Sequence, residues 1–398
     1  MLYDVGRNTC YFLPKIRAQA GVLTNNLHFL TCACFVFQPH DANFACKKMD
    51  ILSNDISSAK GTFRVFRLVN SQGCEAALSS LGAGITAIRV PDARGRIDDV
   101  VLGYARLADY LYDSACAGKT PGRYANRIAR GRFSIGRDEY QLAINNPPNA
   151  LHGGNDGFHN VIWDAEPHDG GVRFTYHAAD GEEGYPGAMD VAVDYVWNDD
   201  NELTISYEAT ADRPTIVNLT NHAYFNLAGE GSGSCLEQRL RLNCHRWLPA
   251  DVTDIPLGSI EPVEGTPMDF LQAKALGRDI GADFSNMRTG KGYNHFFFVD
   301  GWNGDGQLRL VAVLDDDESR RRLSVYSTQC GAMLYTGNWL ADNLPVGKSG
   351  RRYADHDGVA IECQGAPDAP NHPSLPCQVL MPGETYRHVI KYAFSINC

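Results

Sequence analysis

The chain has 398 residues, of which 44% are hydrophobic, and it carries a formal net charge of −11. This length and apolar content are enough for one large or two ordinary globular cores. The net charge is negative, and the one cluster of three basic residues is Arg320 to Arg322. Both features argue against a nucleic-acid groove or an anionic membrane surface as partner. We therefore expect a neutral small molecule as ligand.

The first 48 residues differ in character from the rest. Five basic residues against two acidic ones give this segment a charge of +3, and it holds four of the cysteines. Its apolar run, 27–37, is too short to span a bilayer but lies within the range of a signal-peptide core. Met49 then opens a sequence like an ordinary protein start. We predict that residues 1–48 are an extension outside the fold, from an upstream over-call of the start site; a degenerate export signal is the alternative.

From Thr62 onward the hydrophobic pattern has a period of two, which predicts strands. A hairpin is expected around Gly136 and Arg137, and an acidic turn separates two runs in the last stretch. Residues 104–114 are the best short helical candidate. The alternating stretches are 131–143, 171–178, 188–197, 202–210 and 307–328.

The arrangement of these elements predicts an all-β protein. No repeat of 20 to 50 residues is found, and no linker or charge block divides the chain. One large antiparallel β-sandwich, from about residue 60 to the end, is the economical architecture.

The twelve cysteines are spaced irregularly, with one close pair, Cys32 and Cys34. Neither a zinc ribbon nor a CxxC redox motif can be drawn from them. We expect reduced, mostly buried thiols, which favour a reducing compartment such as the cytoplasm over export.

Polar clusters follow several of the predicted strands, where a β scaffold presents its working groups. They supply histidines, arginines, amides, aromatic rings and a carboxylate. The clusters are 122–131, 149–154, 218–227, 292–297, 327–339 and 360–373.

One carboxylate, Glu362, lies inside an apolar strand-like stretch. Alternation places Glu362 and Gln364 on one face and Ile361 and Cys363 on the other. Glu362 is either an exposed strand residue or a functional group. The proline-rich stretch that follows it would hold the strand end rigidly, which favours function.

The histidines are ambiguous when each is taken alone. His222, in "NHAYFNLAG", is more often a satisfied core histidine than an acid, and His152, in "LHGG", fits a turn. His295 lies beside three phenylalanines and looks structural, while His372 fits a loop between prolines. Asn218 heads an Asn-Leu-Thr glycosylation acceptor, yet we expect it to be buried and unmodified because it precedes His222 by four residues.

Several chemistries are excluded because their motifs are missing from the sequence. There is no HExxH, no GxSxG, no Walker A sequence and no Rossmann glycine fingerprint. A carboxylate, one or two histidines, an arginine and flat aromatic rings remain. This set suits acid–base chemistry on a neutral polyol.

Six motifs in order, covering about residues 62–396, resemble the aldose 1-epimerase (galactose mutarotase) family. They are "GRYANRIARGRF", "NNPPNALHGGNDGFHNVIWDA", "NLTNHAYFNLAG", "VEGTPMDF", "LYTGNWL" and "APDAPNHPSLPCQVLMPGETYRHVIKYAFS". The resemblance implies a large antiparallel β-sandwich of the galactose mutarotase type. It also implies interconversion of the α and β anomers of free aldoses such as D-galactose and D-glucose, without cofactor or metal.

Carried over position by position, the resemblance implies that His222 is the general acid and Glu362 the general base. Sugar-binding roles are implied for Asn126, Arg127, His152, Asn294 and Gln329. The partner would be a small sugar rather than nucleic acid or membrane, and we expect a monomer or at most a weak dimer. A sugar-binding protein without turnover, or an epimerase acting on another cyclic hemiacetal, is the alternative.

One position departs from the family pattern. The family commonly has Asp where this chain has Asn294. Because hydrogen bonds to charged groups contribute about 1.5–3 kcal/mol and neutral ones about 0.5–1.5 kcal/mol, the exchange predicts sugar binding weaker by about 1 kcal/mol. That difference changes KM severalfold and leaves the chemistry intact.

Overall fold

The structure is a computed structural model that describes residues 50–284, 287–343, 345–377 and 379–397. The predicted extension of residues 1–48 lies outside the described residues, so its status stays a prediction. The described residues belong to one compact unit of the chain. None of the helices among them is long and apolar enough to cross a membrane.

The largest sheet has nine strands that are all paired in antiparallel fashion. In spatial order they are β10 (Asp164–His168), β11 (Gly171–Ala178), β12 (Met189–Trp197), β13 (Glu202–Ala211), β26 (Tyr386–Ile396), β22 (Arg321–Ser327), β21 (Arg309–Asp315), β16 (Arg239–Leu242) and β19 (Lys274–Ala275). Four of these strands, β11, β12, β21 and β22, fall within the alternating stretches predicted from the sequence, and β13 extends one residue beyond its stretch.

Two further sheets face this one. The five-stranded sheet runs in chain order through β1 (Asp50–Ser58), β2 (Gly61–Val69), β3 (Glu75–Ser79), β4 (Gly84–Pro91) and β5 (Ile97–Asp99). The six-stranded sheet has the order β15 (Tyr224–Phe225), β24 (Val359–Gln364), β23 (Gly331–Tyr335), β20 (Asn294–Phe298), β17 (Arg246–Leu248) and β18 (Glu261–Pro262).

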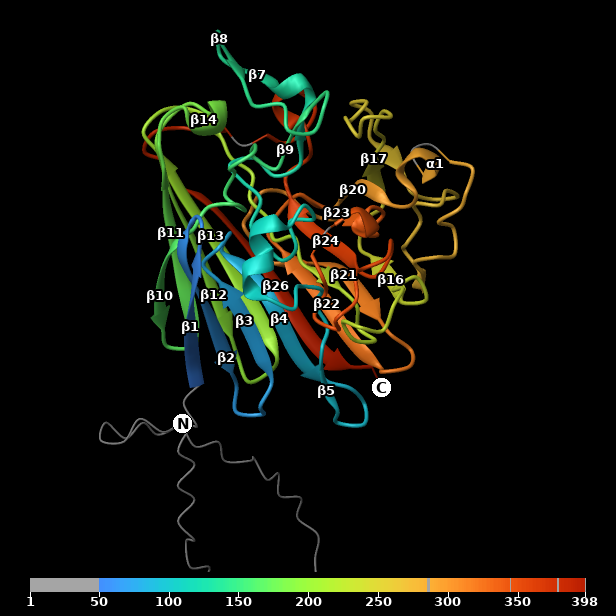
Figure 1. Cartoon of the computed structure of the whole chain (residues 1–398). Helices are drawn as coiled ribbons and strands as arrows, with labels where there is room; N and C mark the ends of the chain where they lie inside the picture. Colours follow the sequence, from blue (N-terminus) through green and yellow to red (C-terminus); the bar gives the residue numbers. More distant parts are fainter. Residues whose placement is uncertain (1–49, 285–286, 344, 378, 398) are drawn as a thin grey trace, which may run out of the picture. The chain divides into compact units, whose positions relative to one another are not determined.

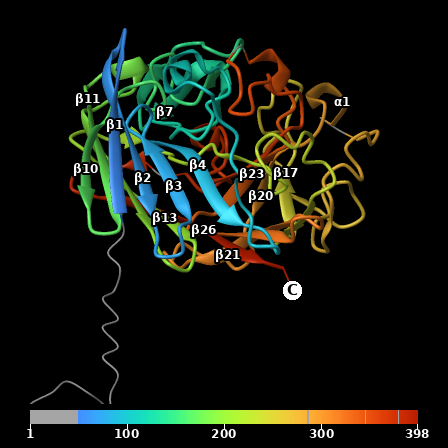
Figure 2. The same ribbon diagram turned by 60° about the horizontal axis from the view of Figure 1, so that its bottom comes forward.

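The core fills the space between the nine-stranded sheet and these two sheets. Phe66 on β2 packs against Phe174 on β11, with ring centroids 6.0 Å apart. Phe225 on β15 packs against Tyr392 on β26, with centroids 5.0 Å apart. Figures 1 and 2 show the blue strands β1 to β3 lying over the green strands β11 to β13. The all-β sandwich predicted from the period-two pattern is therefore confirmed.

Strand β13 shows why the sequence folds in this way. Leu203, Ile205 and Tyr207 are buried in the core, whereas the polar residues between them lie on the opposite, partly exposed face. Successive side chains of a strand point to opposite faces, so alternation in the sequence becomes one apolar and one polar surface.

The remaining elements are short. Residues 104–114, predicted as helical, contain the 3₁₀ helix η1 (Leu107–Tyr112), after which the Asp113 carboxylate accepts the backbone N–H groups of Ala115 and Ala117. The predicted hairpin at Gly136 is confirmed as β7 (Arg132–Ile135) and β8 (Asp138–Gln141). Two more pairs are β6 (Arg127–Ile128) with β9 (Ala150–Leu151), and β14 (Thr215–Ile216) with β25 (Val379–Leu380). The other helices are η2 (Ala129–Gly131), η3 (Glu182–Gly184), α1 (Met287–Gly290), η4 (Leu340–Asp342) and η5 (Ala369–Asn371).

Candidate active site

His222 and Glu362 lie next to each other in the wall of a small cavity. The distance from His222 Nε2 to Glu362 Oε1 is 3.6 Å, and both side chains are buried. Neither His222 Nδ1 nor Glu362 Oε2 has a hydrogen-bond partner among the described residues. Both residues line the cavity, so a ligand that enters it lies against this pair.

Strand β24 delivers Glu362 to this cavity. Ile361 and Cys363 point into the main core, and Glu362 points to the opposite face, as the alternation predicts. Every residue of β24 is buried, because β15 and β23 flank it and other segments cover both faces. The alternative that Glu362 is an exposed strand residue is therefore wrong.

The loop before β15 holds His222 by its backbone. The N–H of His222 donates to the carbonyl of Lys119, and the N–H of Gly118 donates to the carbonyl of His222. The side chain of Asn221 also donates to the carbonyl of Gly118. These bonds leave the imidazole free of backbone partners, facing the rings of His152 and Tyr224, so His222 is not the satisfied core histidine considered from the sequence.

The short pair of β6 and β9 brings together two motifs that are separate in the sequence. Arg127 pairs with Leu151, and the N–H of His152 donates to the carbonyl of Asn126. The N–H of Asn126 in turn donates to Nδ1 of His152, which fixes the ring and leaves its other nitrogen facing the cavity. Asn126, Arg127 and His152 therefore reach the cavity as one unit.

Asn218 joins this unit to the segments of His222 and Glu362. It is buried, as expected, and its side-chain amide donates to the carbonyls of Ala125 and Gly365. Its side-chain oxygen accepts the N–H of Gly365. In the sequence, Asn218 stands out only as a glycosylation acceptor, and no local signal reveals this positioning role because its partners are distant in the sequence.

The electrostatic environment sets the protonation of two groups. Burial raises the pKa of Glu362 above its usual value, while the nearby charges of His222 and Arg127 lower it. Burial holds the pKa of His152 well below its usual value, and His222, His159 and Arg127 lower it further. His152 is therefore a neutral hydrogen-bonding group, and Glu362 is a carboxyl whose proton affinity is tuned by its neighbours.

A second polar group lies around Arg127. The guanidinium Nη2 lies 3.0 Å from Oδ2 of Asp254, and the Asn294 amide donates to the same oxygen at 3.1 Å. Arg127 Nε also donates to Oδ1 of Asn146. Asp254 and Asn146 were missed in the sequence because both stand in turns, where acids and amides are common and carry no signal of their own.

The cavity has a volume of about 270 Å³. Pockets for drug-sized ligands span roughly 300–1,000 Å³. Because this cavity lies just below that range, it suits a smaller ligand, of monosaccharide size. Trp339, about half exposed, stands at the cavity with Nζ of Lys291 over its ring at 3.7 Å. The lining residues are Ser114, Ala115, Cys116, Asn126, Arg127, Asn146, Leu151, His152, His222, Tyr224, Asp254, Asn294, Tyr335, Trp339, Leu340 and Glu362.

Six of the seven residues predicted for the site line this cavity, and Gln329 does not. Gln329 lines a different cavity and donates its amide to Oη of Tyr386 at 3.0 Å. It lies in the turn before β23, and the backbone N–H of Gln329 is held by Ser327 Oγ. The structure therefore does not bring Gln329 together with the other six predicted residues. His295 faces the core beside Trp247, as its apolar neighbours indicated.

Three of the site residues also have the composition of a metal site. Ligand atoms of His152, His222 and Glu362 all lie within 4.8 Å of one another. Two imidazoles and a carboxylate form a donor set that zinc uses in catalytic sites. In the part of the chain that the structure describes, this is the one such group, and it coincides with the His222 and Glu362 pair.

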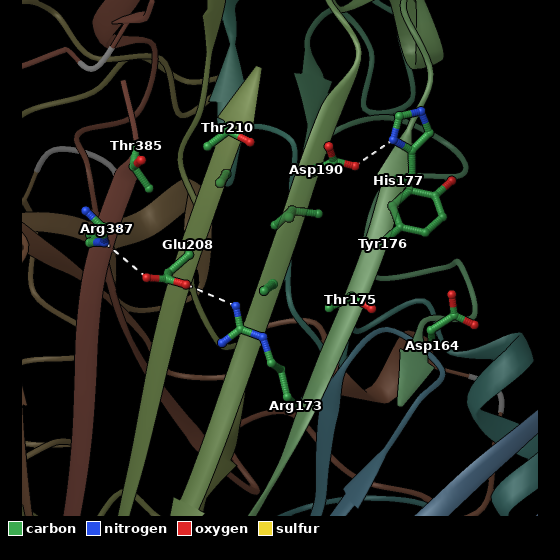
Figure 3. Close-up of a pocket in the computed structure, with 13 residues that line it drawn as sticks. Asp164, Arg173, Thr175, Tyr176, His177, Asp190, Glu208, Thr210, Thr385 and Arg387 are labelled. Atoms are coloured by element: carbon green, nitrogen blue, oxygen red, sulfur yellow. Dashed lines mark hydrogen bonds and ion pairs between the residues drawn. The ribbon is translucent and has the colours of Figure 1, made fainter. Parts of the chain in front are cut away.

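A separate depression of about 490 Å³ lies on the outer face of the nine-stranded sheet (Figure 3). Most of its polar groups contact one another: Glu208 pairs with both Arg173 and Arg387, and His177 Nδ1 lies 2.7 Å from Oδ1 of Asp190. Exposed pairs of this kind contribute roughly 0–1 kcal/mol and require no ligand. None of the residues predicted for the site lies there.

Comparisons with known proteins agree with this fold. The sequence profile described as aldose 1-epimerase matches residues 64–393. The galactose mutarotase of Sus scrofa is 41% identical over 342 residues, which cover 86% of this chain and 97% of that protein. The aldose 1-epimerase of Escherichia coli K12 is 36% identical over 336 residues, which cover 83% and 95%.

Solved structures show the same architecture. An aldose epimerase homologue from C. elegans superimposes with a TM-score of 0.77 at 30% identity, covering 87% of this chain and 100% of that one. A galactose 1-epimerase from Lactobacillus acidophilus gives 0.76 at 25% identity, covering 88% and 100%. The fold, the site and these likenesses define an enzyme of the isomerase class. The chain belongs to the aldose 1-epimerase family, which confirms the resemblance seen in its motifs.

Proposed function

We propose that the protein interconverts the α and β anomers of a free aldose such as D-galactose or D-glucose, with His222 as general acid and Glu362 as general base. The observation that carries this proposal is the pairing of these two side chains, 3.6 Å apart, in a cavity of monosaccharide size. Support also comes from the family to which the chain belongs.

Anomer exchange requires two proton transfers when the sugar ring opens and two when it closes. To open the ring, the Glu362 carboxylate takes the proton of the C1 hydroxyl while the His222 imidazolium donates a proton to the ring oxygen, and the C1 to ring-oxygen bond breaks. Rotation about the bond between C1 and C2 then presents the other face of the aldehyde. Closure reverses both transfers and leaves the acid and the base in their starting states.

The geometry suits these transfers for a simple reason. The C1 hydroxyl oxygen and the ring oxygen are bonded to the same carbon, so an acid and a base that serve both must be neighbours in space. Nε2 of His222 and Oε1 of Glu362 meet this requirement. Each positioned group contributes about 10²–10⁴-fold to the rate.

The other polar groups bind and orient the sugar in this proposal. Neutral His152 and the guanidinium of Arg127 donate hydrogen bonds to hydroxyl groups. Oδ1 of Asn126 is used by the backbone N–H of Arg127, so its side-chain amide hydrogens remain for the sugar. Asn294 lies on β20 beside Tyr335 of β23 and closes the same side of the cavity.

Polarimetry of freshly dissolved α-D-galactose tests the proposal. Wild type should speed the approach to the equilibrium rotation, and His222→Gln and Glu362→Gln should each slow it by at least about a hundredfold. His177→Gln, which changes an exposed histidine on β11, serves as the matched control and should behave as wild type. Equal rates for wild type and the two site variants would contradict the mechanism. Calorimetric binding of the sugar without catalysed mutarotation would instead identify a binding protein.

We also propose that residues 1–48 lie outside the catalytic fold and that the protein works in the cytoplasm. Supporting the second point, the seven described cysteines are free thiols, and six of them are buried. A chain starting at Met49 should retain the polarimetric activity of the full chain, and loss of folding in that chain would contradict the first point.

A further inference from the structure

Asp254 is a carboxylate of the cavity that no motif predicted. Its Oδ2 makes two interactions, an ion pair with Nη2 of Arg127 at 3.0 Å and a hydrogen bond from the Asn294 amide at 3.1 Å. No described residue donates to Oδ1. The side chain is 27% exposed while Arg127 is 13% exposed, so the carboxylate stands nearer to solvent in the cavity than the guanidinium that it neutralises.

The backbone holds Asp254 in place from several sides. The Asp251 carboxylate accepts the N–H groups of Thr253 and Ile255, and the N–H of Asp254 donates to the carbonyl of Asp251. The side chain of Asn149 donates to the carbonyl of Thr253 and so ties this turn to the segment that carries His152. Asp254 has φ of 62°, a left-handed conformation that Asp and Asn tolerate and that persists where the surroundings fix it.

Arg127 connects this carboxylate to the proton-transfer pair. Its charge lowers the pKa of Glu362, and it also lowers that of Asp254, although burial raises both. A guanidinium donates hydrogen bonds and a carboxylate accepts them. Side by side, the two groups match neighbouring hydroxyls on a sugar ring, one of which accepts while the next donates.

We propose that Asp254 is a substrate-binding residue that selects neutral aldoses, its Oδ1 accepting a hydrogen bond from a ring hydroxyl next to the one that Arg127 binds. This inference rests on the proposed anomerase function. Of the two neighbouring residues Asp254 and Asn294, Asp254 carries a negative charge and Asn294 is neutral. A carboxylate in this place also repels a substrate that carries its own carboxylate, such as a uronic acid.

Asp254→Asn tests the proposal because asparagine keeps the shape of the side chain and tolerates the left-handed backbone. Mutarotation is followed with D-galactose and with D-galacturonate, at matched ionic strength. For galactose, KM should rise severalfold with kcat changed much less, as expected when a charge-assisted hydrogen bond becomes a neutral one. The ratio of kcat/KM for galacturonate to that for galactose should rise, because the repelling charge is gone.

The pair Asp254 and Asn294 allows an exchange experiment. The double variant D254N/N294D restores one carboxylate and one amide beside Arg127 and should recover most of the galactose kcat/KM lost in D254N. N294D alone places two carboxylates at one guanidinium and should lower kcat/KM. Asp190→Asn, which removes an exposed charge on β12, is the matched control and should leave both sugars unaffected.

Two outcomes would overturn the assignment of Asp254. One is an unchanged KM and an unchanged sugar ratio in D254N. The other is an equal loss for both sugars without recovery in D254N/N294D, which would mean that Asp254 only supports Arg127 structurally. Wild type that fails to catalyse mutarotation of galactose would overturn the proposed function and this inference together, whereas an active wild type with an unaffected D254N overturns this inference alone.

Discussion

The Nε2 atom of His222 lies 3.6 Å from Oε1 of Glu362, and each residue leaves one buried polar atom without a partner among the described residues. The two reach this distance because β15, which follows His222, pairs directly with β24, which carries Glu362. A strand pairing therefore sets the separation of the acid and the base. Such a pairing holds the site more rigidly than a contact between two loops would.

Glu362→Gln should abolish activity and stabilise the fold. Burial raises the pKa of Glu362 above the usual value of 4.5, so the folded protein holds this proton more tightly than the unfolded chain does. Ionising the carboxyl therefore costs stability. The cost is absent below the usual pKa and is fully present once the pH exceeds the raised value. The free energy of unfolding of the variant should therefore exceed that of wild type at pH 7 and nearly equal it near pH 4.

Chemical denaturation of wild type and Glu362→Gln at both pH values measures this difference. Equal stabilities at pH 7 would show that the buried carboxylate is compensated and would contradict the expectation. Glu166→Gln, which changes an acid of the exposed edge strand β10, should have no effect at either pH.

The acid limb of the pH profile should lie above the usual pKa of a glutamic acid. Glu362 must be ionised to act as base, so kcat/KM falls as the pH drops through its raised pKa. Arg127→Met removes a charge that lowers this pKa, so the limb should move to higher pH while the overall rate falls. Arg173→Met, on the outer face of the nine-stranded sheet, should leave the limb in place. A limb that stays fixed in Arg127→Met would argue against Glu362 as the titrating base.

Gln329→Ala should leave kcat/KM within about threefold of wild type because Gln329 does not line the His222 and Glu362 cavity. The variant loses the hydrogen bond to Oη of Tyr386 and should be less stable by about 0.5–1.5 kcal/mol. Steady-state kinetics and thermal unfolding separate the two effects. A large rise in KM without loss of stability would restore Gln329 to the sugar-binding group.

Asn218→Ala should be costly for both stability and activity. The substitution leaves the buried N–H of Gly365 and two carbonyls without the amide that bonds them, which should lower the free energy of unfolding by about 2–4 kcal/mol. The segments of Arg127, His222 and Glu362 then lose a shared anchor, so kcat of the folded fraction should also fall. Asn155→Ala, in an exposed loop, is the matched control. Wild-type kcat in Asn218→Ala would show that the anchor is dispensable.

The alternation of side chains was enough to predict most of the large sheet. Stretches 171–178 and 202–210 become β11 and β13 with nearly the predicted bounds, because the two faces of a strand are written locally in its sequence. The same rule placed Glu362 opposite Ile361 and Cys363. For the stretch 104–114 the sequence predicted a helix but not its type, since a 3₁₀ helix and an α-helix share their short-range hydrophobic spacing.

The sequence by itself determined the sheet-forming pattern and the family, and it singled out seven candidate site residues of which six line the cavity, because alternation and motifs are local properties. Only the tertiary structure decided that Gln329 belongs to another cavity, that Asn218 ties three segments together, and that Asp254 stands beside Arg127 and Asn294. The physical reason is that residues from distant turns come together only through the spatial order of the strands, such as β15 beside β24. No local sequence pattern encodes that order.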